Sequence, residues 1–165
     1  MKLLGEKSLS KHIKFFLIIL SIICFLCILL GGFYMLKFWQ TISTLPIAIP
    51  IVLIYFTGII ALILLVQFIG IFHCFEEGKL FVTENVSRLK ISYICSFSIF
   101  IIYTIIIIYF IYLMHNSFEL YSFILPTITL FIIDFVFLIF AIGLVILTEL
   151  YKKSIKYKEE NDLTI

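Results

Sequence analysis

The sequence predicts an all-α integral membrane protein, a single bundle of four transmembrane helices with both termini in the cytoplasm. Its composition is the first reason: 64% of the 165 residues are apolar and only 13% are charged, against about 25% charged in an average soluble domain. The second reason is that the apolar residues form four long runs, and a helix needs about 20 such residues to cross a bilayer. The third is the one-sided distribution of the basic residues around these runs.

The four runs predict spans within one membrane domain covering residues 1–165, at approximately 15–36, 47–69, 91–114 and 123–148. The third is rich in isoleucine, which favours strands in water. A membrane strand, however, has only about 9–11 residues and alternates in polarity, whereas these runs are twice as long and do not alternate. The first run is too long for a signal-peptide core of about 7–15 residues and lacks a cleavage site. We therefore expect four helices and no cleaved leader.

The basic residues predict the orientation of these helices. Every lysine and arginine except Lys37 lies in residues 1–14, 72–90 or 149–165. Because basic residues are enriched on the cytoplasmic side of membrane proteins, both termini and the central loop 72–90 are expected in the cytoplasm. The protein is thus expected to span the plasma membrane four times, with residues 149–165 as a cytoplasmic tail.

Glycine, threonine and proline predict where the helices end. The second helix is expected to continue beyond the bilayer and to end at Gly78, because glycine readily adopts the left-handed conformation of a helix C-cap. Thr83 is a suitable first residue for the third helix, since its hydroxyl can cap a helix N-terminus. Pro126 is expected in the first turn of the fourth helix, after a short polar loop at 115–122.

Asp134 is the one ionisable residue of the fourth span. A charged residue at mid-bilayer costs at least about 2.5–3.5 kcal/mol, so it should face the other helices or be protonated. Thr57, Tyr103 and Thr104 lie at similar depth and are its expected neighbours, and Thr127, Asp134, Ala141 and Thr148 form a stripe suited to close helix packing. We favour a protonated acid that rigidifies the bundle through a hydrogen bond; the alternative is a site of proton or cation coupling.

Other chemistry has little support in the sequence. His73, Cys74 and Glu77 lie within one helical turn, but without further ligands they do not predict a metal site. Cys24 and Cys27 lie in hydrocarbon without charged neighbours, and we interpret them as small apolar residues. No nucleophile–base pair or phosphate-binding loop is present, so we expect no enzymatic activity, cofactor or metal. The formal net charge of +2 does not predict nucleic-acid binding.

The C-terminal tail changes sign along its length. Lysines that can anchor the protein on anionic lipid precede an acidic ending, Glu159-Glu160-Asn161-Asp162-Leu163-Thr164-Ile165. Its branched apolar residues and terminal carboxylate form a short segment that a partner could capture.

Two stretches resemble the bacterial membrane family known as domain of unknown function 2975. One is the acidic ending; the other is the motif Phe75-x-x-Gly78-x-x-Phe81-x-Thr83-x-Asn85-Val86-x-Arg88-Leu89. Members of that family are typically encoded beside a small helix-turn-helix regulator of the Cro/repressor type. The resemblance therefore implies a protein of the bacterial plasma membrane that partners or controls a transcription factor. It implies no catalytic residues.

Two classes of function follow from these observations. The first is a regulatory partner or sensor whose cytoplasmic face binds the regulator, with expected contacts at Phe75, Gly78, Phe81, Thr83, Asn85, Arg88, Glu160, Asp162, Leu163 and Ile165. The second is a small transporter or an immunity-type membrane protein that uses Asp134, with Thr57, Tyr103 and Thr104 around it. Association into homo-oligomers is compatible with both.

Overall fold

The computed structural model describes residues 4–43, 48–78, 82–116 and 120–162, and almost all of them lie in four helices. These are α1 (Leu4–Ser43), α2 (Ala48–Glu76), α3 (Thr83–Asn116) and α4 (Leu120–Asp162). Each contains a stretch long and apolar enough to cross a bilayer, and the described ranges contain no strand. The prediction of an all-α protein with four potential spans is therefore confirmed.

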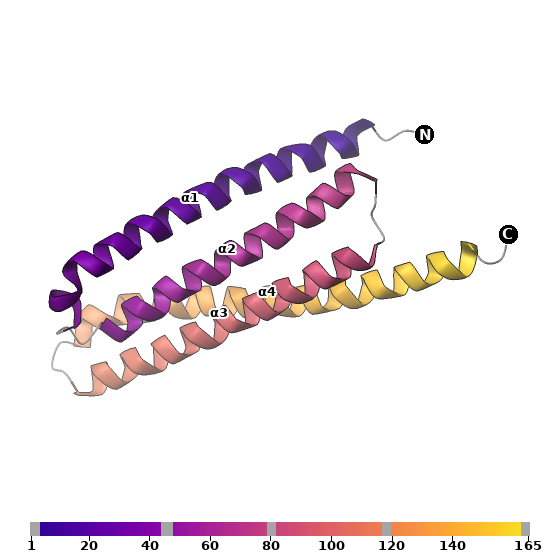
Figure 1. Ribbon diagram of the computed structural model, residues 1–165. Helices are drawn as coiled ribbons and strands as arrows, with labels where there is room; N and C mark the ends of the chain where they lie inside the picture. The colour runs from indigo at the N-terminus through magenta and orange to yellow at the C-terminus, as the bar shows by residue number, and fades with distance from the viewer. Residues whose placement is uncertain (1–3, 44–47, 79–81, 117–119, 163–165) are drawn as a thin grey trace.

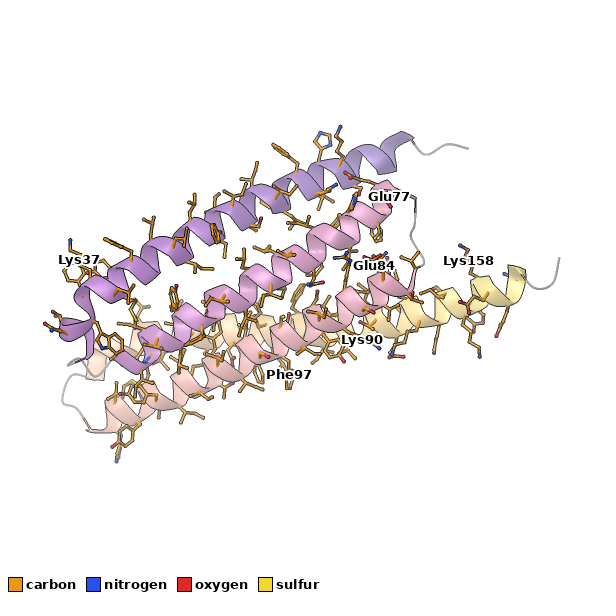
Figure 2. The ribbon with its side chains drawn as sticks, in the orientation of Figure 1. Lys37, Glu77, Glu84, Lys90, Phe97 and Lys158 are labelled. Atoms are coloured by element: carbon orange, nitrogen blue, oxygen red, sulfur yellow. The ribbon has the colours of Figure 1, made fainter. Side chains whose placement is uncertain are left out.

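The helices run alternately up and down, and each packs against the next in the chain (Figure 1). Within the described ranges α1 packs against α2 alone and lies at the edge of the assembly. Both termini and the α2–α3 connection lie at the same end of the molecule (Figure 1). We call this the basic end, because Lys90 and Lys158 lie there, together with Glu77 and Glu84, whereas Lys37 lies at the opposite end (Figure 2).

The helices extend beyond the apolar runs at several of their ends. α3 continues to Asn116 and α4 already begins at Leu120, so the polar loop expected at 115–122 is mostly helical. Pro126 consequently lies in the second turn of α4 rather than in the first, where its missing N–H leaves one carbonyl of the preceding turn without a helical donor. Polar residues also continue the helices outward at the basic end, and α4 reaches Asp162.

The seam between α3 and α4 follows a spacing of alternately three and four residues. Its α3 side contains buried small residues, Ser92 and Ser96, and its α4 side contains Ala141 and Thr148. The hydroxyls of both serines and of Thr148 donate to carbonyls four residues earlier in their own helices. These residues therefore serve mainly as small side chains that let two helices approach closely, as the stripe on the fourth span predicted.

Near the basic end, three helices share a small hydrophobic core. Ile71 of α2, Leu89 of α3 and Leu144 of α4 are its buried centre. Phe75 and Tyr151 pack against this centre from α2 and α4. The core fixes how the extensions of three helices at the basic end are placed relative to one another, and this positions the candidate site.

Candidate functional site

The turn after α2 has the geometry that its glycine predicted. Gly78 has φ +76°, in the left-handed region that glycine accepts at low cost. Its N–H donates to the carbonyl of Phe75 at 3.1 Å, and the N–H of Glu77 donates to that of His73 at 3.2 Å. After the connection, α3 begins at Thr83, as expected. The end of α2 therefore has a glycine C-cap.

The motif residues around this turn divide into an inner and an outer group. Asn85 is completely buried, Leu89 is 2% exposed, and Phe75 packs on the hydrophobic core. Gly78 and Thr83 are exposed. The inner residues hold α2 and α3 together, and the outer ones form the surface that another molecule can reach without opening the structure.

Arg88 joins the two groups. Its Nη2 donates to Oε1 of Glu84 at 2.6 Å, one helical turn earlier in α3. The guanidinium also lies directly against the backbone of Gly70 in α2: a Cβ added at Gly70 would stand 1.9 Å from Nη1 of Arg88. The glycine thus provides the space that the arginine occupies. Arg88 is a packing element between α2 and α3 and is only partly accessible from outside.

An ionic network ties α1 to α2 at the same end. Nζ of Lys14 donates to Oε2 of Glu76 at 2.7 Å and lies 3.3 Å from Nδ1 of His73. Nε2 of His73 is 3.4 Å from Oε1 of Glu77, and the Ser10 hydroxyl donates to the carbonyl of Phe72. His73 and Glu77 do share a helix face, but Cys74 is buried. In the described part of the chain, no group of three or more His, Cys, Asp or Glu side chains could hold a metal.

The end of α4 displays the charged tail as a helix. Nζ of Lys156 lies 3.7 Å from Oε1 of Glu160, and both side chains are well exposed. Beyond the apolar run 123–148, a hydrogen bond from Lys152 lowers the pKa of the Glu149 carboxyl, and burial raises the pKa of the Tyr151 phenol. Asp162 is the last residue of α4. Phe81, Leu163 and Ile165 lie outside the described residues.

Asp134 lies inside the seam and is 7% exposed. Its Oδ2 accepts a hydrogen bond from the Thr104 hydroxyl of α3 at 3.2 Å, and its Oδ1 has no partner among the described residues. The hydroxyl of Thr104 also lies 3.0 Å from the carbonyl of Phe100. Among the described residues, the Thr104 hydroxyl is thus the only hydrogen-bond partner of the Asp134 carboxyl group, and it also lies close to the Phe100 carbonyl.

The other predicted neighbours lie beside a cavity rather than on the acid. Thr57 and Tyr103 line a cavity of about 260 Å³ between α2, α3 and α4. The Thr57 hydroxyl donates to the carbonyl of Ile54 at 2.7 Å. Phe137, which also lines the cavity, packs against the ring of Tyr103. Of the three residues expected around Asp134, only Thr104 is bonded to it.

Four long apolar helices, each able to span a bilayer, with their charges concentrated at the ends (Figure 2), define an integral membrane protein of the multi-span class. Within this class, residues 6–165 match the model of one family, described as "Protein of unknown function (DUF2975)". Because the match covers nearly the whole chain, the protein belongs to this family. Comparison with curated proteins and with solved structures gave no match.

Several residues of the site were not predicted from the sequence. The pair of Glu84 and Arg88 could have been recognised, because opposite charges four residues apart face each other on a helix. The contact of Gly70 with Arg88 and the bond of Lys14 with Glu76 join different helices. No local sequence pattern indicates either of these two contacts between helices.

Proposed function

We propose that this protein is a regulatory partner or sensor of the bacterial plasma membrane that binds a small helix-turn-helix transcription regulator at its cytoplasmic face. In this proposal the basic end lies in the cytoplasm, and the protein has no catalytic role. The supporting observation is that the family motif and the helical tail lie at the same end (Figure 1). The motif's inner residues build a packed joint, and Gly78, Thr83 and Glu160 are exposed around it.

A packed joint suits such a role because it can couple the membrane to the surface. Leu144 of α4 and Leu89 of α3 belong to one core, so a shift of α4 within the bilayer moves the exposed surface at the end of α3. A signal molecule changes how strongly the regulator is bound only if that signal molecule binds the two arrangements of the helices with different affinity. We propose that the signal acts on α4.

Co-purification with the regulator encoded by the adjacent gene tests this proposal. We expect the full chain in detergent to retain the regulator and a chain lacking residues 159–165 to retain much less. Glu159→Gln/Glu160→Gln should also weaken retention, whereas Glu149→Gln, an acid at the start of the same tail, should not. Absence of binding to the full chain contradicts the proposal.

A second function, transport of protons or cations, is favoured by one observation. Asp134 is buried, and its Oδ1 has no hydrogen-bond partner among the described residues; buried membrane acids often mark ion pathways. The test is flux into liposomes that contain the purified protein. Flux that Asp134→Asn abolishes supports transport or an immunity-type activity, whereas absence of flux with normal regulator binding supports the first proposal.

A further inference from the structure

A groove between the start of α3 and the end of α4 has a composition that the proposed function does not explain. It has a volume of about 420 Å³ and is open to the outside. Because the two helices are antiparallel, the first turns of α3 meet the last turns of α4 there (Figure 1). Lys90 of α3 and Lys152 and Lys156 of α4 line this groove together. Three lysines from two helices thus line one groove.

The remaining lining residues complete a site for an anion. The Thr83 hydroxyl is a further hydrogen-bond donor, and the exposed Ser87 hydroxyl can become one by exchanging its 3.3 Å bond to the Thr83 carbonyl. Buried Val86 and half-buried Ile155 form an apolar floor. The N-terminus of α3 adds a partial positive charge. Glu159 also lines the groove, Lys152 donates to Glu149, and Lys156 is close to Glu160. These pairs are exposed, so a better anion can displace their carboxylates from the lysines.

The position of the groove indicates where that anion comes from. Lys90 directly precedes the apolar run 91–114, and Lys152 follows the run that ends at residue 148. Lipid phosphates lie in the headgroup layer just outside the hydrocarbon. Ile94, Phe97 and Ile101 follow Lys90 at helical spacing, and each is about half exposed. Their spacing places them on the face of α3 that carries Lys90, where they form an apolar track for an acyl chain; Figure 2 shows Phe97 further along α3 from Lys90.

We propose that this groove is a specific binding site for an anionic phospholipid. The lysines and hydroxyls bind the headgroup phosphate, and an acyl chain lies along the exposed face of α3. The bound lipid would then clamp the start of α3 to the end of α4. This inference rests on the groove alone and stands whether or not the protein binds a transcription regulator.

The chain provides a matched control for the test. Lys153 and Lys158 belong to the same helix as Lys152 and Lys156 but do not line the groove. Lys152→Gln/Lys156→Gln and Lys153→Gln/Lys158→Gln therefore remove the same charge from the same tail. Lys90→Gln tests the contribution of the other helix. Both pairs are exposed, so the unfolding temperature without lipid should equal that of the unchanged protein and verify the fold.

The measurement is the thermal unfolding midpoint of the full-length protein in detergent, titrated with soluble short-chain phosphatidylglycerol. Phosphatidylcholine of the same chain length and inorganic phosphate are the comparison ligands. We expect phosphatidylglycerol to raise the midpoint more than either. Since each lysine near a membrane surface strengthens anionic-lipid binding appreciably, the groove pair should weaken the apparent affinity about tenfold or more, Lys90→Gln less, and the control pair about twofold at most.

Three results would overturn the proposal. Equal weakening by the groove pair and the control pair means attraction by the tail's total charge rather than a site. An equal effect of phosphatidylcholine removes the requirement for an anion. An equal effect of inorganic phosphate makes the ligand a free anion instead of a lipid.

Discussion

At the scale of single residues, Thr104 and Asp134 are the point where two membrane helices meet through a polar bond. The hydroxyl of Thr104 lies 3.2 Å from Oδ2 of Asp134 and is also close to its own helix. Interhelical hydrogen bonds in membranes contribute modestly, about 0.6 kcal/mol on average. The hydrogen bond therefore contributes mainly to the alignment of α3 along α4 and only a little to the free energy of their association.

This pair gives the first prediction. Thr104→Val should lower the free energy of unfolding by about 0.5–1.5 kcal/mol, because the buried acid loses its described donor. Thr104→Ser should stay within a few tenths of the unchanged protein. Unfolding in mixed micelles of increasing dodecyl sulfate measures both. Thr129→Val is the control, since the Thr129 hydroxyl donates only to its own helix; a loss as large there would argue against a role of the pair.

Gly78 gives a second prediction at this scale. With φ +76°, a residue with a Cβ is strained, at a cost of roughly 1–2 kcal/mol. Apart from its chain neighbours, no described residue has an atom within 4 Å of the position of such a Cβ, so the expected cost of Gly78→Ala is conformational rather than steric. Gly143→Ala, also in open space but within α4, should be neutral or slightly stabilising. Equal effects of the two substitutions would contradict this reading of the turn.

At the scale of helices, α1 depends on its contact with α2. The glycine pair Gly31 and Gly32 faces Tyr55: a Cβ at Gly32 would lie 2.7 Å from the Tyr55 hydroxyl oxygen, whereas one at Gly31 would lie at an ordinary 3.7 Å from the ring. Close approach at glycine is a common way for membrane helices to pack. Tyr55 cannot retreat without moving its ring, so the two glycines differ in importance.

The third prediction uses that difference. Gly32→Ala should reduce the free energy of unfolding by about 1–3 kcal/mol through overpacking, while Gly31→Ala should be nearly neutral. The two substituted glycines are consecutive residues of α1, so each variant is a control for the other. Cysteine crosslinking between α1 and α2 provides a second measurement, and it should slow in Gly32→Ala alone. Similar behaviour of both variants would show that Tyr55 does not set the distance.

The same scale shows what could be predicted from the sequence. Length and hydropathy predicted the number and type of the helices, because a chain in lipid must satisfy its backbone bonds within each span. Local chemistry predicted the ends at Gly78 and Thr83. The helical residues 115–116 and 120–122 were not predicted, because polar residues there resemble a loop. The contact of Arg88 with Gly70 was not predictable, because it depends on how two helices are placed in space.

At the scale of the whole molecule, the chain concentrates its recognisable chemistry at one end. The motif, the Lys14 network, the lysine groove and the end of α4 all lie at the basic end, and Lys37 lies at the other (Figure 2). Within the described residues α1 packs only on α2 and therefore lies at the edge of the assembly. The exposed apolar faces of α1 are then in contact with lipid. α2 packs against both α1 and α3 and thereby connects α1 to the other helices.

The orientation of this end in the membrane is the fourth prediction. The basic-end residues should face the cytoplasm, because basic segments are retained on that side during insertion. Single cysteines at Lys37 and Lys158 would be introduced after the native cysteines (Cys24, Cys27, Cys74 and Cys95) are replaced by alanine. In intact cells, a maleimide that cannot cross the membrane should label Lys37→Cys. It should label Lys158→Cys only after the cells are permeabilised.

The labelling also tests a requirement of the regulatory proposal. A regulator that binds DNA is confined to the cytoplasm, so its binding surface must be there too. The reverse pattern, with Lys158→Cys labelled in intact cells, would place the motif and the tail outside and exclude a regulator as partner. The lysine groove would then meet the outer leaflet, and lipid binding by the purified protein would be unaffected. One experiment thus tests the orientation on which the regulatory proposal depends, independently of the lipid site.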